Sequence, residues 1–208
     1  MKNLLIIGEV NMLTIKTVSR NQGESAVGIA GYYSGEILYS HYAGCEIMGM
    51  YDAEEILYSQ IFLPFNAPRK FFNRQTLWNV AEQSETRPDS RLAREVIFPL
   101  PQWLNKIDLI EFVSGFAYEN FVRHGMCADV AIIANTIMGI RYAHVLLTTR
   151  VVSKDGFGRC KCRYWNKRDY IGLWNRNLQN LLTELSQRKT KSNSETIITN
   201  KQGGINYV

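Results

Sequence analysis

Two apolar runs in the second half of the chain constrain its fold most strongly. They cover residues 130–134 and 143–152 and are rich in valine, isoleucine, leucine and alanine. Short apolar runs of this composition are typical of strands that are buried on both faces. A third run, residues 92–100, places Val96 and Phe98 on one face and ends among prolines, which cannot donate to a central ladder. We therefore expect a sheet in which the first two runs are neighbouring central strands.

Helical periodicity occurs before, between and after these strands. Residues 103–124 give the clearest pattern, because Ile110, Val113, Ala117 and Phe121 recur at i, i+3, i+7 and i+11. The other predicted helices cover residues 24–39, 73–86 and 168–186, and a further strand covers 10–19. Residues 40–58 are ambiguous, and a short hairpin is one interpretation. The irregular alternation predicts the α+β class, with a central, mostly antiparallel sheet flanked by helices.

The length and composition favour one domain followed by a tail. The chain has 208 residues, of which 46% are hydrophobic, which suffices for one substantial core. We expect this domain to span residues 10–186. From Gln187 onward the chain is rich in lysine, serine, threonine, asparagine and glycine, so we expect residues 187–208 to form a disordered tail.

Charge and cysteine usage narrow the function only slightly. The net charge of +5 suits a polyanionic partner, but many proteins of this charge bind no nucleic acid. The four cysteines match neither a disulfide framework nor a zinc site, so free thiols in a reducing cytoplasm are expected. No stretch approaches the roughly 20 apolar residues of a membrane helix. The sequence therefore predicts a soluble, cytoplasmic protein with no membrane partner.

Four groups of segments carry a family resemblance. In order, they are 16–20 with 25–27 and 31–35; 77–79 with 91–96 and 100–101; 125–126 with 128–132 and 143–150; and 155–158 with 163–167. No group is specific alone, but their order and spacing together resemble the MobA/MobL relaxases, over residues 12 to about 185. Relaxases of this family nick one DNA strand to start plasmid mobilisation.

The resemblance implies a particular chemistry. A tyrosine attacks a phosphodiester and forms a 5′-phosphotyrosine bond. Since a free tyrosine has a pKa near 10, the site must deprotonate or desolvate it and must stabilise charge on the phosphate. The resemblance implies a divalent metal, Mg²⁺ or Mn²⁺, on three histidines. Two of these flank one hydrophobic residue on a central strand, which defines the histidine-hydrophobic-histidine type of relaxase fold.

Two residues of this chain match catalytic positions of the family. Tyr32 matches the nucleophile; Tyr33 lies about 100° around the same helix, so we expect only one of them to face the site. Glu95 matches an acidic residue that orients an imidazole or assists proton transfer. A packed tyrosine, and a solvated Glu95 paired with Arg94, are the structural alternatives.

The metal positions depart from the family. His144 matches the last histidine, but Tyr142 and Ile133 occupy the other two positions. Isoleucine cannot bind a metal, and a neutral tyrosine is a weak ligand. His41 and His124 are no obvious replacements. We therefore expect poor nicking or none.

The resemblance also implies partners. Arg20, Arg94 and Arg150 are candidates for phosphate contacts with single-stranded DNA at a transfer origin, with ordinary surface arginines as the alternative. Other mobilisation proteins are further candidate partners. The sequence thus predicts an impaired relaxase of plasmid conjugation or mobilisation. A non-catalytic, DNA-binding remnant of a relaxase is the alternative, and an unrelated α+β protein is a third.

Overall fold

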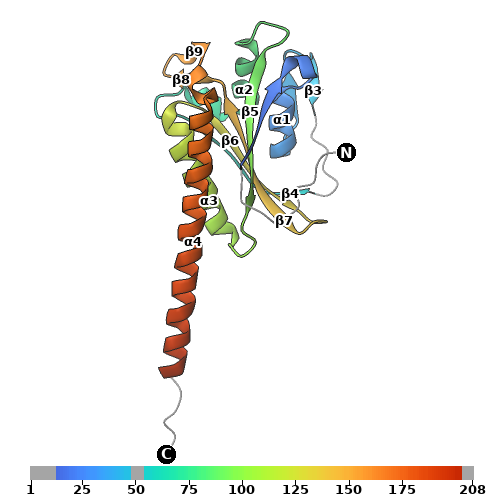
Figure 1. The fold of residues 1–208 in the computed structure, drawn as a ribbon. Helices are drawn as coiled ribbons and strands as arrows, with labels where there is room; N and C mark the ends of the chain where they lie inside the picture. Colours follow the sequence, from blue (N-terminus) through green and yellow to red (C-terminus); the bar gives the residue numbers. More distant parts are fainter. Residues whose placement is uncertain (1–12, 48–53, 203–208) are drawn as a thin grey trace, which may run out of the picture.

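A five-stranded antiparallel sheet forms the centre of the molecule (Figure 1). The computed structural model describes residues 13–47 and 54–202. The strand order is β1-β5-β7-β6-β4. The strands are β1 (Thr14–Ser19), β4 (Glu54–Phe62), β5 (Arg91–Leu100), β6 (Ala128–Asn135) and β7 (Ile140–Thr148). The predicted α+β class is confirmed, and β6 and β7 are neighbours as expected.

The hairpin of β6 and β7 fixes which side chains share a face. Ala131 pairs with His144, and Ile133 pairs with Tyr142. The apolar run predicted over 143–152 is two strands, because β7 ends at Thr148 and β8 (Arg150–Ser153) begins a separate ribbon with β9 (Gly156–Lys161). Beyond Thr148 the backbone therefore pairs with β9 and leaves the central sheet.

Each face of the sheet is covered by two helices (Figure 1). Helices α3 (Lys106–Asn120) and α4 (Arg168–Gln202) cover the face that includes Val96 and Phe98. Helices α1 (Ala26–Ser34) and α2 (Arg74–Gln83) cover the other face. Short 3-10 segments lie at Arg20–Gln22, Arg69–Phe72, Val122–His124 and Arg163–Asn166. Trp78, Trp165 and Trp174 are buried in these cores, so they pack within the fold.

Helix α1 is shorter than the predicted helix over 24–39. Ser25 caps its start by accepting a hydrogen bond from the Gly28 amide, at 3.1 Å. Gly35 ends it with φ +73°, a conformation that favours glycine. The chain then turns back so tightly that a Cβ at Gly31 would lie 2.9 Å from the Glu36 carbonyl oxygen. The hairpin suggested for the ambiguous region is present as β2 (Leu38–Ser40) and β3 (Cys45–Ile47), while residues 48–53 lie outside the described part.

Helix α4 is longer than predicted. The prediction of a disordered tail is wrong for residues 187–202, because the helix continues to Gln202 and extends beyond the sheet (Figure 1). Its polar composition suggested disorder, but the chain has no proline or glycine between Gly172 and Gly203 to end a helix. Within the described residues, no helix combines the length and apolar character needed to cross a membrane.

A buried ion pair attaches α2 to the sheet. The Asp129 carboxylate on β6 accepts hydrogen bonds from Arg74 Nε at 2.8 Å and Arg74 Nη2 at 2.9 Å. It accepts a third from Trp78 Nε1 at 2.8 Å. Burial alone would lower the pKa of Arg74, but Asp129 and then Glu36 raise it above its usual value. The pair therefore keeps its charges inside the fold.

We expect Asp129→Ala to lower the free energy of unfolding by about 3–5 kcal/mol, because it leaves the Arg74 charge buried and without Asp129. Urea denaturation measures this change. Asp155→Ala, in the exposed turn before β9, is the matched control and should change stability by no more than about 0.5 kcal/mol. Equal stability of the two variants would contradict a structural role for the buried pair.

Candidate active site

A histidine and a glutamate meet on the face of the sheet covered by α1 and α2. His144 lies on β7, directly opposite Ile97 of β5, so Glu95 is its diagonal neighbour. His144 Nε2 and Glu95 Oε1 are 2.9 Å apart. His144 is 1% exposed and Glu95 is 7% exposed. The sequence-predicted pair is therefore brought together, and Glu95 is not the solvated strand carboxylate of the alternative interpretation.

Burial sets the charge of this pair. Desolvation lowers the pKa of His144, and the hydrogen bond to Glu95 opposes that effect without overcoming it. The imidazole is therefore neutral at neutral pH. The hydrogen bond between Nε2 and Glu95 fixes the plane of the imidazole ring.

The two tyrosines of α1 form an array of rings with His144. The Tyr33 ring stacks on the His144 ring, with centroids 3.4 Å apart and an interplanar angle of 14°. The Tyr32 ring packs edge-on against Tyr33 at 5.0 Å and 84°. Tyr33 thus stacks directly on His144, and Tyr32, the expected nucleophile, packs edge-on against Tyr33.

The three positions that the sequence analysis matched to metal histidines share this face of the sheet. Ile133 and Tyr142 are a cross-strand pair, and His144 is two residues along β7 from Tyr142. Ile133 is fully buried. In the part of the chain that the structure describes, no three His, Cys, Asp or Glu side chains are arranged to hold a metal ion. The residues present therefore do not fit the three-histidine metal site of the resemblance.

The two remaining histidines lie elsewhere. His41 follows β2, and its Nδ1 is 2.9 Å from Gln83 Nε2 of α2. His124 ends a 3-10 turn after α3, and its ring lies 6.0 Å from that of Tyr170. Neither lies on the strands that carry His144 and Glu95.

The three candidate DNA-binding arginines all have contacts inside the chain. Arg20 donates to the carbonyl oxygens of Glu82, in the last turn of α2, and of Glu85 and Arg87, just after that helix. Arg150 pairs with Glu85 at 2.8 Å and also donates to the Ser84 carbonyl. Both therefore stabilise the C-terminal end of α2.

Arg94 lies on the opposite face of the sheet from Glu95. It is 6% exposed, it donates to Asn166, and its guanidinium lies 5.7 Å from the Trp174 ring centroid. Arg94 is therefore not part of the surface around His144.

Sequence reasoning missed the acidic residues that position α1 and α2. Besides Asp129, these include Glu82 of α2, whose Oε1 accepts hydrogen bonds from Ser25 Oγ at 2.7 Å and the Val27 amide at 3.1 Å. A carboxylate at the N-terminus of α1 also suits the helix dipole. The signal for Asp129 was its place inside an apolar strand, where a charge requires a partner.

Comparison with known proteins adds to this geometry. The model of the MobA/MobL family matches residues 24–201. This chain belongs to the MobA/MobL family. A probable mobilization protein MobA of Bifidobacterium longum is 26% identical to it over 151 residues, which cover 73% of this chain and 26% of that protein. A conjugal transfer protein TraA of Agrobacterium fabrum is 28% identical over 155 residues, covering 69% of this chain and 14% of TraA. This MobA/MobL chain thus spans only about a quarter or less of these relatives.

A solved structure has a similar fold. It comes from work on the molecular basis of vancomycin resistance transfer in Staphylococcus aureus. The TM-score is 0.76 at 26% identity, and the match covers 87% of this chain and 94% of that chain. Most of this MobA/MobL chain therefore shares its fold with that protein.

We expect the stability of this MobA/MobL chain to fall as the pH drops below about 6.5, the unfolded pKa of histidine. His144 has a lowered pKa when folded, so the unfolded chain takes up a proton first and is favoured. The slope from this residue is at most about 1.4 kcal/mol per pH unit. Chemical denaturation between pH 7.5 and 5 in metal-free buffer measures it.

In that experiment His144→Gln should lose less stability than the wild type over the same pH range. His41→Gln, which removes an exposed histidine, should behave as the wild type. A wild-type profile that matches His144→Gln would show that His144 is not the group that titrates.

Proposed function

We propose that this chain is a relaxase domain of plasmid conjugation or mobilisation that binds single-stranded DNA and nicks it poorly or not at all. The observation that carries the proposal is the array in which Tyr32 and Tyr33 of α1 pack against His144, which contacts Glu95 on the sheet of a MobA/MobL fold. The MobA and TraA relatives are named for mobilisation and conjugal transfer, which supports the same assignment.

The proposed reaction makes clear what each residue must do. The Tyr32 oxygen would bond to the scissile phosphorus as the bond to the 3′ oxygen breaks, leaving a 5′-phosphotyrosine and a 3′-hydroxyl. The phenol proton must leave, and the departing 3′ oxygen must gain one. Tyr33 and His144 support the Tyr32 ring through the stacked array, while Glu95 holds the imidazole in place.

The site provides little positive charge to stabilise the transition state of this reaction. The transition state carries negative charge on the phosphate, which cations or aligned donors must stabilise. In the family, three histidines hold a metal ion that supplies positive charge. Here His144 is neutral, and Ile133 and Tyr142 supply neither a metal ligand of that kind nor a charge of their own. Lys16, paired in register with Glu95, is a cation whose field reaches His144. One exposed lysine is a poor substitute for a divalent metal, so we infer slow nicking or none.

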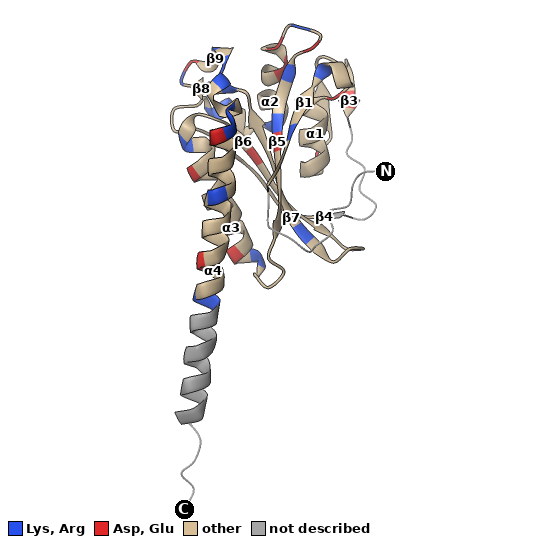
Figure 2. Ribbon diagram, in the orientation of Figure 1, with Lys and Arg blue, Asp and Glu red and all other residues tan. Residues whose placement is uncertain are grey.

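A non-catalytic module for binding single-stranded DNA is the second candidate. It is favoured by Ile133, a buried aliphatic side chain at a position where the resemblance to the family predicts a metal-binding histidine. Figure 2 shows lysine and arginine gathered where β8, β9 and the start of α4 meet. The basic residues along this segment are Arg150, Lys154, Arg159, Lys161, Arg163, Lys167 and Arg168. Such a patch suits the phosphate backbone in either candidate function.

We expect the purified chain to bind labelled single-stranded oligonucleotides of random sequence, with affinity that falls as salt rises. The slope of log K against log salt should be about −0.7 for each phosphate neutralised. Fluorescence anisotropy measures it, with the duplex form of the same oligonucleotides as control. Binding that is absent, or that does not respond to salt, would contradict both candidate functions.

We expect Mn²⁺ to bind the double variant Ile133→His and Tyr142→His much more tightly than the wild type, because the variant supplies three imidazoles on one face. Isothermal titration calorimetry measures both affinities. In the double variant, a covalent adduct with single-stranded DNA should form in Mn²⁺ and should be lost in Tyr32→Phe.

Tyr33→Phe in the same background is the matched control, and it should still form the adduct. Loss of the adduct in Tyr33→Phe alone would move the nucleophile to Tyr33. A wild type that binds Mn²⁺ as tightly as the double variant would overturn the proposed impairment.

A further inference from the structure

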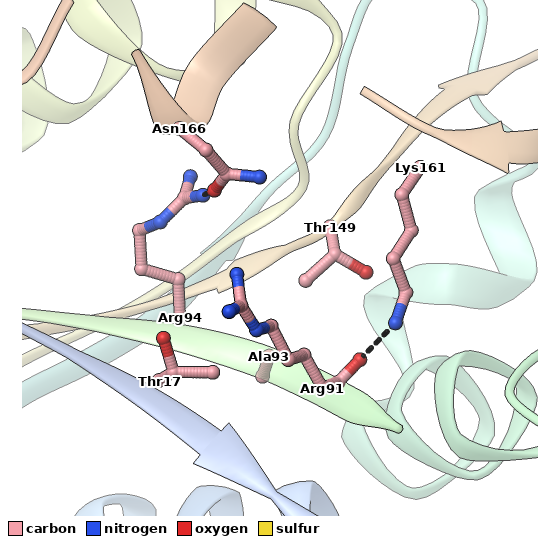
Figure 3. Close-up of a pocket in the computed structure, with 7 residues that line it drawn as sticks. All are labelled: Thr17, Arg91, Ala93, Arg94, Thr149, Lys161 and Asn166. Carbon is pink, nitrogen blue, oxygen red and sulfur yellow. Dashed lines mark hydrogen bonds between the residues drawn. The ribbon is translucent and has the colours of Figure 1, made fainter. Parts of the chain in front are cut away.

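A small pocket lies beside Arg94, on the side of β5 that faces away from His144. Its lining consists of Thr17, Arg91, Ala93, Arg94, Thr149, Lys161 and Asn166 (Figure 3). The pocket is small, with a volume of about 20 Å³, and it opens to solvent. The pocket combines β1 and β5 with residues that follow β7, end β9 and precede α4, so segments distant in sequence build it together.

Arg94 is a buried cation that lacks a full set of partners. Its Nη2 contacts Asn166, but its Nη1 is buried and has no hydrogen-bond partner in the described part of the chain. Burial lowers the pKa of Arg94, and the nearby charge of Arg91 lowers it further. A buried guanidinium in this state is costly, and a bound anion would remove the cost.

The pocket also has more positive than negative charge. Lys161 Nζ lies 2.9 Å from Glu85 Oε2, and the other oxygen of Glu85 is paired with Arg150. Within the described residues, no carboxylate forms an ion pair with Arg91 or Arg94. Figure 3 shows both guanidinium groups extending to the same side of β5, with the Thr149 hydroxyl nearby.

We propose that this pocket binds a phosphate group. Guanidinium groups match the geometry of phosphate oxygens and donate charge-assisted hydrogen bonds to them. The hydroxyls of Thr17 and Thr149 can donate to the remaining oxygens. We infer that the group is a backbone phosphate of single-stranded DNA, and only this choice of source rests on the proposed function. Strand β1 forms one edge of the sheet. Such DNA would pass around that edge, from the face covered by α1 with its tyrosines to the pocket on the other face.

The pocket is tested with inorganic phosphate and the full chain. At constant ionic strength, phosphate in place of chloride should raise the thermal unfolding midpoint of the wild type. Arg91→Ala, at an exposed position, and Arg94→Met should need phosphate concentrations higher by about tenfold or more for the same shift. Lys106→Ala, an exposed lysine of α3, removes the same charge elsewhere and should respond as the wild type.

Two results would overturn the proposal that the pocket binds phosphate. One is a wild type whose midpoint does not respond to phosphate. The other is an equal response in the wild type, Arg91→Ala and Lys106→Ala. Arg91→Ala keeps the test valid if Arg94→Met does not fold.

The source of the phosphate is tested by DNA binding. Arg91→Ala should reduce the salt slope for single-stranded DNA by about 0.7 relative to Lys106→Ala. If the phosphate shift is lost in Arg91→Ala while its DNA affinity and slope equal those of Lys106→Ala, the ligand is free phosphate and the DNA source is wrong. If phosphate binds and no form of the chain binds DNA, the proposed function is wrong, but the proposal that the pocket binds a phosphate group is supported.

Discussion

The buried pair of Asp129 and Arg74 is the interaction on which the placement of Tyr32 and Tyr33 over the sheet depends. It joins the centre of the sheet to α2 through two parallel hydrogen bonds. Helix α2 in turn holds the start of α1 through the Glu82 carboxylate. Helix α1 then places the Tyr33 ring on His144. The position of the tyrosines is therefore set by a chain of charge-assisted hydrogen bonds that begins two strands away from Glu95.

The buried ionisable groups of this protein fall into three cases. Asp129 and Arg74 satisfy one another, so they stabilise the fold without an outside partner. Arg94 lacks a counter-charge within the described chain and is therefore suited to an external anion. His144 stays neutral, which favours packing against Tyr33 but supplies no positive charge to the phosphate of the proposed DNA substrate. Each case follows from the cost of desolvating a charge.

Much of the architecture was predictable because hydrophobic periodicity reports which faces are buried. The central strands and α3 followed from this signal, and the meeting of Glu95 with His144 followed from motif order. The contacts of Arg20 and Arg150 with the end of α2 could not be predicted, because they depend on tertiary docking of segments about 65 residues apart. The same holds for Tyr33, since a period of 3.6 residues cannot tell which of two adjacent rings faces the sheet. The extension of α4 was missed because a polar composition without helix breakers suits both a helix and a disordered tail.

The hairpin of β6 and β7 has a consequence for how this site can vary in evolution. Four residues, Thr136–Gly139, connect the two strands, and their length sets which side chains lie opposite one another. Side chains alternate between faces, so a shift of one residue would move His144 to the side of α3 and α4 and bring Val145 to the side of α1. The length of the turn is therefore constrained, and so is Gly139, whose φ of +62° favours glycine. A substitution at a position such as Ile133 would alter the chemistry of the face, whereas a single insertion or deletion in the turn would exchange the side chains on it.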